Sequence, residues 1–185
     1  MHQLTIRFQI PEPALRMLGV RAIAMIRTRT QETHIDASGQ PFTPYSTRPF
    51  VRPLGGITQK AMRALGKGLQ RFTTRQGRLW ALITGGYAAY KAAAFPEDGD
   101  GVNLTQRGHM LGALTVVGVS GGDGGPASVR IGFTRHEEAL KALYHNVTGA
   151  GKRHVIRRFL GLTPAERKEL ARMAGETIIF LPALS

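Results

Sequence analysis

The sequence contains no cysteine, which excludes disulfide bridges and thiolate metal sites. No apolar run approaches the roughly 20 residues that a membrane-spanning helix needs, so we expect no membrane partner. Residues 1–7 lack the apolar block and the small-residue cleavage site of a signal peptide. Together these absences predict a soluble intracellular protein.

Residues arranged for catalysis are also scarce. The histidines form no H-E-x-x-H pair, and His145 and His154 match a His-Asn-His nuclease only faintly. The glycine-rich segment 121–125 lacks the lysine and hydroxyl of a phosphate-binding loop, and no serine lies in a G-x-S-x-G elbow. We therefore predict no catalytic residue, no cofactor and no metal site. The inventory favours a binding or structural protein over an enzyme.

Acidic residues are few, and the basic residues are unevenly distributed. The chain has 25 Lys and Arg against 12 Asp and Glu, a net charge of +13. Residues 1–80 hold 13 basic and 3 acidic side chains, and between Arg48 and Arg78 there are eight basic residues and no acidic one. Such a segment attracts phosphate or carboxylate surfaces, so nucleic acid or an acidic protein is one expected partner. A solvated basic loop without a specific target is the alternative.

The fold class follows from length and periodicity. At 185 residues and 42% apolar content, the chain is predicted to form a single domain over residues 1–185. Apolar residues recur at helical spacing from Ala14 to about Arg29, with Arg27 and Arg29 assigned to a basic face. β-branched segments at 114–119 and 128–133 flank a hairpin loop, and Thr163 starts the last helix. These elements predict an α+β fold, a small antiparallel sheet packed against a long N-terminal helix and a C-terminal helix.

Two further segments carry specific expectations. Residues 35–78 are rich in proline and glycine and are predicted to form a long extended basic loop, with a short helix around 58–65. In its first part, turn-forming residues precede two aromatic residues, Phe42 and Tyr45, and Pro41 and Pro44 stiffen it. Asn103 is predicted to cap a short helix that ends near Leu111.

Three segments in order resemble a known family. The first runs from Arg27-Thr28 through Asp36-Ala37-Ser38-Gly39-Gln40-Pro41-Phe42-Thr43-Pro44-Tyr45-Ser46. The second is Tyr90-Lys91 followed by residues 102–111, which include Asn103-Leu104-Thr105-Gln106-Arg107-Gly108. The third is Arg157-Arg158-Phe159-Leu160-Gly161-Leu162-Thr163. Their order resembles the virion-morphogenesis or tail-completion proteins of tailed bacteriophages, which join head to tail.

The resemblance implies a structural role in the neck of the virion. It implies a homo-oligomeric ring, most simply a hexamer, assembled in the bacterial host cytoplasm. The partners would be the connector or adaptor and the tail terminator or tail tube proteins, with possible contact to packaged DNA. The family supplies no catalytic residues. Its motifs and the neighbouring basic residues give a candidate partner interface: Phe42, Pro44, Tyr45, Arg48, Arg52, Arg157, Arg158 and Phe159.

Two alternatives stay open at this stage. A basic DNA-binding accessory protein would explain the charge without a ring. Phe42 and Tyr45 could also fold back onto the chain's own core and offer nothing to a partner. A nuclease, the third class considered, would need metal-dependent activity through His145 or His154.

Overall fold

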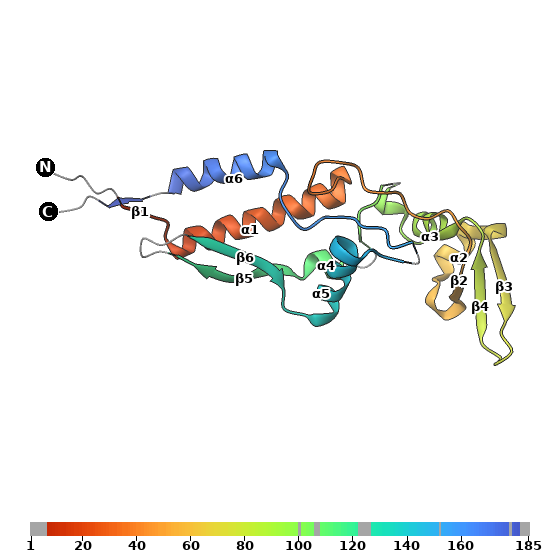
Figure 1. Cartoon of the computed structure of the whole chain (residues 1–185). Coiled ribbons are helices and arrows are strands. Elements are labelled where there is room, and N and C mark those ends of the chain that lie inside the picture. The colour runs from red at the N-terminus through yellow and green to blue at the C-terminus, as the bar shows by residue number, and fades with distance from the viewer. Residues whose placement is uncertain are drawn as a thin grey trace, which may run out of the picture. The chain divides into compact units, whose positions relative to one another are not determined.

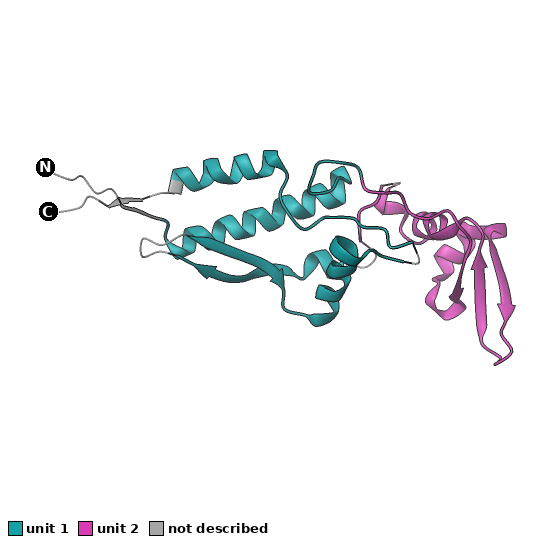
Figure 2. Cartoon of the chain, viewed as in Figure 1, with its two compact units in different colours: residues 1–41, 108–185 teal, residues 42–107 magenta. Residues whose placement is uncertain are grey.

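The computed structural model describes residues 7–181 except 100, 106–107, 122–126, 152 and 178. The chain divides into two compact units (Figure 2). Unit 1 comprises residues 1–41 and 108–185, and unit 2 comprises residues 42–107. Unit 2 is therefore an insertion within the sequence of unit 1.

Unit 1 mixes helices with two short antiparallel pairs of strands. Its described elements are β1 (Arg7–Gln9), α1 (Glu12–Thr28), a π-helical turn (Arg29–Thr33), α4 (His109–Gly112), β5 (Leu114–Ser120), β6 (Ser128–Phe133), α5 (His136–Leu143), a second π-helical turn (Tyr144–Thr148), α6 (Pro164–Thr177) and β7 (Ile179–Leu181). β1 pairs with β7, and β5 pairs with β6 with a register shift between Val116 and Gly118.

Helix α1 is the centre of unit 1. It packs against β5 and β6 and also against α6, and Figure 1 shows it between the hairpin and that helix. Its buried face is apolar, as its helical spacing predicts. The buried residues of α1 are Leu15, Gly19, Ala22, Ile23 and Ile26.

Gly19 explains how closely the helix approaches the hairpin. A Cβ atom added at this position would lie 2.6 Å from a methyl carbon of Val116 and 2.7 Å from one of Val129. Such distances are well inside van der Waals contact, so only glycine fits here without a shift of the helix or the strands. This local need outweighs the low helix propensity of glycine.

Unit 2 has its own sheet and its own core. Its described elements are β2 (Phe50–Pro53), a 3₁₀ turn (Leu54–Gly56), α2 (Gln59–Leu65), a 3₁₀ turn (Gly66–Gly68), β3 (Leu69–Thr73), β4 (Leu79–Ile83), α3 (Gly86–Ala94) and a 3₁₀ turn (Pro96–Asp98). The sheet is antiparallel in the order β2-β4-β3. The core consists of Ile57, Ala61, Ala81, Ile83 and Tyr90.

The predicted fold class is confirmed, because long N-terminal and C-terminal helices accompany small antiparallel sheets. The helix from Ala14 to about Arg29 and the strands at 114–119 and 128–133 are present within a few residues. The last helix also starts as predicted, since Thr163 and Glu166 form the reciprocal cap.

Two predictions are wrong in detail. Residues 35–78 are not one extended loop, because the strands β2 and β3 lie within them and contribute to the core of unit 2. The short helix predicted around residues 58–65 is confirmed, since α2 spans Gln59–Leu65. The helix predicted after Asn103 begins only at His109, because the Asn103 side chain accepts a hydrogen bond from the Thr105 backbone and closes a turn there. Gln106 of the second motif lies outside the described residues. Whether the two compact units fold as the predicted single domain stays a prediction.

Candidate functional site

The candidate site lies where α1 ends, and the first and third sequence motifs meet there. The helix continues into the π-helical turn and stops at His34, whose backbone is left-handed with φ of +57°. The Thr33 hydroxyl donates to the Arg29 carbonyl at 2.8 Å and holds this last turn. We name this region the α1 junction and define it as residues 27–41 together with residues 157–166.

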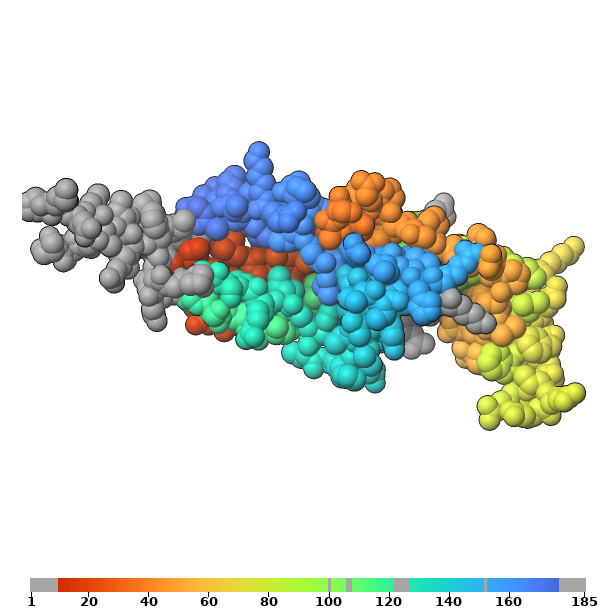
Figure 3. All heavy atoms as spheres, in the orientation of Figure 1, coloured from red at the N-terminus to blue at the C-terminus, as the bar shows by residue number. Residues whose placement is uncertain are grey.

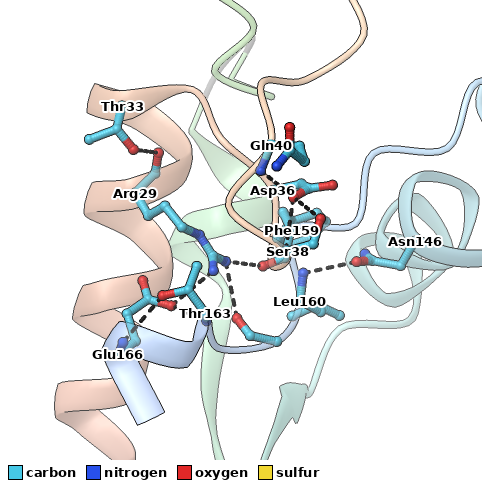
Figure 4. Close-up of polar contacts among 11 residues, drawn as sticks. Arg29, Thr33, Asp36, Ser38, Gln40, Asn146, Phe159, Leu160, Thr163 and Glu166 are labelled. Atoms are coloured by element: carbon cyan, nitrogen blue, oxygen red, sulfur yellow. Dashed lines mark hydrogen bonds and ion pairs between the residues drawn. The ribbon is translucent and has the colours of Figure 1, made fainter. Parts of the chain in front are cut away.

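Arg29 connects the two motifs directly (Figure 4). Its Nη2 donates to the carbonyl oxygens of Phe159 at 2.6 Å and Gly161 at 3.0 Å. Its Nη1 lies 2.9 Å from the Glu166 carboxylate, and the two side chains are only 5% and 14% exposed. A planar guanidinium suits this arrangement, since it offers several donors in a fixed geometry.

Burial and the neighbouring carboxylates shift the pKa of Arg29 in opposite directions. Burial lowers the pKa of Arg29 from its ordinary value, while the carboxylates of Glu166 and Asp36 act to raise it. The charge is compensated by Glu166, which also caps α6 by accepting from the Thr163 backbone at 2.7 Å. The same carboxylate oxygen therefore starts the last helix and neutralises the buried arginine.

The loop after the helix is held by Asp36. Its Oδ1 accepts from the Ser38 backbone at 2.8 Å, the Ser38 hydroxyl at 2.6 Å and the Gln40 backbone at 3.0 Å. Partial burial alone would raise the pKa of Asp36, but these hydrogen bonds and the charge of Arg29 lower it overall. Gly39 takes a φ of +84°, which a residue with a side chain rarely adopts. The turn predicted from these residue types is therefore present.

The third motif lies along this loop. The Ala37 backbone donates to the Arg158 carbonyl at 2.8 Å, and a Cβ atom on Gly161 would come within 3.0 Å of the Ala37 side chain. On its other side, the Leu160 backbone donates to the Asn146 side chain at 2.8 Å. The segment 157–163 is thus fixed by backbone hydrogen bonds on two sides.

His145 lies beside this segment and is unlike an exposed histidine. Its carbonyl accepts from the Arg157 backbone at 2.6 Å. Burial, reinforced by the positive charge of Arg157, lowers the pKa of His145 to about 4 from its ordinary 6.5. The imidazole is therefore neutral near pH 7, and the residue is partly buried.

Arg27 hydrogen-bonds to backbone carbonyls at the end of the second motif and just after it, as Arg29 does in the third. Its guanidinium donates to the carbonyls of Leu111 at 2.9 Å, Gly112 at 3.1 Å and Leu114 at 2.9 Å. These carbonyls lie at the end of α4 and the start of β5, where helical partners are missing. The two arginines of the α1 junction therefore hold chain segments that are distant in sequence.

The first part of the second motif lies in unit 2 and depends on Lys91. This residue is 3% exposed, and its ammonium donates to the Asp98 carboxylate and to the Thr105 carbonyl. The ammonium also lies 4.5 Å from the ring centroid of Phe95, within cation–π distance. The lysine thus connects the first part of the second motif to Asp98 and to Thr105 in its second part.

The predicted interface residues fall into three groups. Buried in the chain are Phe42 at 6%, Arg157 at 7% and Phe159 at 0% exposure. Exposed are Pro44, Arg48 and Arg158. Partly buried are Tyr45, whose ring meets Tyr87 edge to face at 5.1 Å, and Arg52, which lies 4.6 Å over the Tyr90 ring. Their role in binding a partner stays a prediction. In the folded chain, the exposed residues of this set are the ones that a partner could contact directly.

Sequence reasoning missed the role of Arg27 and Arg29. Both were assigned to a basic face, whereas the structure buries Arg29 and partly buries Arg27. Their position could have distinguished them from the exposed arginines of the helix. Both lie near the end of the helix, before a loop that must return to it. Arg16 and Arg21, which lie earlier on the same helix, are exposed as expected.

The polar side chains of the α1 junction described above contact other groups of the same chain. Within the described residues, no cluster of three His, Cys, Asp or Glu side chains is placed to hold a metal ion. In the same part of the chain, no helix has both the length and the apolar character needed to cross a membrane. Comparison of the chain with family models, with curated proteins and with solved structures finds no match.

Proposed function

We propose that this chain is a structural subunit of the head–tail connection of a tailed bacteriophage. In this proposal it assembles in the host cytoplasm as a ring, most simply a hexamer, and joins the connector to the tail in the neck of the virion. It acts by complementary binding and not as an enzyme. The proposal starts from the resemblance of the three ordered motifs.

The observation that carries the proposal is the contact between two of those motifs. Residues around 27–41 and 157–163 are far apart in sequence, yet Arg29 and Ala37 hydrogen-bond to backbone carbonyls of the third motif. A resemblance built from short segments gains support when two of those segments contact each other, because one set of contacts then depends on both. The polar groups of the junction serve those contacts, which agrees with a building role.

The exposed side chains beside the junction supply a surface for neighbours. Arg158 is exposed although its carbonyl is bound within the junction, so its guanidinium is available to an acidic group on another subunit. A ring needs head-to-tail interfaces in which different patches meet and the rotation closes. Arginine is common in such interfaces because its fork pairs well with carboxylates.

The test is the mass of the purified full chain, measured by mass photometry alone and with purified connector and tail proteins. We expect one discrete ring mass, either alone or with one of these partners. Arg158→Glu should weaken the ring because it reverses a charge at the proposed interface, while Arg167→Glu on α6 reverses the same charge elsewhere and serves as the control.

A chain that stays monomeric with every connector and tail component would overturn the proposal. Equal loss of the ring in both variants would show that total charge, and not the Arg158 surface, governs assembly. The alternative, a DNA-binding accessory protein, predicts that the chain stays monomeric in every mixture with connector and tail proteins. The measured mass would then be that of a monomer and not that of a ring.

A further inference from the structure

Unit 2 carries an unusual concentration of unopposed positive charge. Residues 42–107 contain ten Lys and Arg against three acidic residues, and the first of those acids is Glu97. Two of the acids are engaged within the unit, Glu97 near Lys60 at 3.7 Å and Asp98 with Lys91. The sheet and helix α2 therefore lie in a segment with no acidic side chain.

The hairpin of β3 and β4 is an ordered arm of this unit. The two strands pair antiparallel from Leu69 opposite Ile83 to Thr73 opposite Leu79. Figure 1 shows the turn at the free end of the hairpin, beyond α2, and Figure 3 shows the same segment at the surface of the unit. α2 and α3 pack over the other end, where Ala81 and Ile83 lie in the core.

The turn itself is fixed by hydrogen bonds. The Thr74 backbone donates to the Arg78 carbonyl at 2.9 Å, and the Thr74 hydroxyl accepts from the Arg78 backbone at 3.2 Å. Gly77 supplies the required positive φ of +73°. The tip is thus preorganised, so holding a ligand there costs little additional ordering.

Three arginines lie along this arm. Arg75 and Arg78 are exposed at the turn, and Arg71 is exposed on β3, where its guanidinium is 3.7 Å from the Met62 sulfur. Within the described residues none of the three forms an ion pair, unlike Arg16 and Arg172 of unit 1. Exposed arginines that form no ion pair with the described carboxylates match the geometry and charge of phosphate groups.

We propose that the β3–β4 hairpin is a phosphate-binding arm for duplex DNA. A two-stranded β-ribbon has the width that the major groove admits, and arginines at its tip would reach the phosphates on either side of that groove. The contacts are to the backbone, so binding is independent of base sequence. The proposal does not rest on the ring assignment, since a single unit carries all of its residues.

The experiment uses the full chain and a short fluorescein-labelled duplex, with anisotropy measured over a series of salt concentrations. The test variant is R75A/R78A, and the matched control is R167A/K168A, which removes two exposed charges from α6 of unit 1. We expect the hairpin variant to bind roughly tenfold more weakly. The slope of log affinity against log salt is negative, and its magnitude should decrease by about 2, because two phosphate contacts are lost. The control should keep the wild-type slope.

Further variants and measurements test how the hairpin holds the DNA. R75K/R78K should retain most of the affinity, since lysine also contacts phosphates as a point charge. Trp80 is the single tryptophan of the chain, and it lies opposite Phe72 in the hairpin. In the wild-type protein its fluorescence should therefore change when DNA binds to the hairpin. Circular dichroism checks that both alanine variants stay folded, as their exposed positions predict.

Several results would overturn the proposal. Equal weakening in the hairpin variant and the α6 control would show attraction by net charge alone. Tighter binding of a single strand than of the duplex would indicate unpaired bases as the ligand. Equal competition by polyglutamate would indicate an acidic protein surface. Each outcome is independent of the ring mass, so failure here leaves the proposed neck role standing.

Discussion

A single buried guanidinium holds much of the α1 junction together. Arg29 makes hydrogen bonds to two carbonyls and an ion pair with Glu166. A buried charge is costly unless it is paired and hydrogen-bonded, and loss of one member leaves the others desolvated and unpaired. The contribution of this residue is therefore expected to differ sharply from that of an exposed arginine on the same helix.

We predict that Arg29→Lys lowers the free energy of unfolding by about 2–4 kcal/mol, because one ammonium cannot replace the fork at all three acceptors. Arg16→Lys is the control, since its ion pair with Glu12 is more than half exposed and should cost less than about 1 kcal/mol. Urea denaturation of the three proteins measures both. Similar stabilities for the two variants would contradict the assigned role of Arg29.

At the scale of elements, the packing of α1 against the β5–β6 hairpin depends on the absence of a side chain. Gly19 is buried against Val116 and Val129, where a Cβ atom would clash. Gly175 in α6 has the opposite surroundings, because nothing lies within 4 Å of a Cβ atom placed there. The two glycines therefore separate packing from helix propensity.

We expect Gly19→Ala to destabilise the chain by about 1–3 kcal/mol through overpacking, even though alanine favours helix. Gly175→Ala should stabilise it by about 0.5–1 kcal/mol, since propensity alone acts there. Thermal unfolding of the two variants gives opposite shifts if the packing is as described. A stabilising Gly19→Ala would mean that the helix and hairpin lie farther apart.

At the scale of the whole molecule, the two compact units raise the question of cooperativity. Unit 2 has its own core around Ile83 and Tyr90, and it contains the only tryptophan, Trp80. The longest helices, α1 and α6, belong to unit 1. Tryptophan fluorescence therefore reports on unit 2, while the helical circular dichroism signal reports mainly on unit 1.

We predict that unit 2, with the smaller core, unfolds at a lower urea concentration than unit 1. The fluorescence transition of Trp80 should then precede the loss of the helical signal. Coincident transitions would contradict this and would favour one cooperative domain over residues 1–185, as the length of the chain suggests.

Much of the local structure could be predicted from the sequence. Helical spacing predicted α1, β-branched runs predicted β5 and β6, and the Thr163–Glu166 spacing predicted the cap of α6, because each depends on residues close in the chain. The turn at Asp36 was foreseeable for the same reason. Charge counts also located the basic segment, residues 48–78, which forms about half of unit 2.

The tertiary structure decided which of these residues are available to a partner. Composition could not show that residues 35–78 build a sheet and a core, because that core is completed by β4 and α3 from later in the chain. Nor could it separate Arg29, buried among distant carbonyls, from Arg75, exposed on a hairpin turn. Both are arginines in a basic chain. What distinguishes them is the desolvation of one and the hydration of the other, and only the folded arrangement sets that difference.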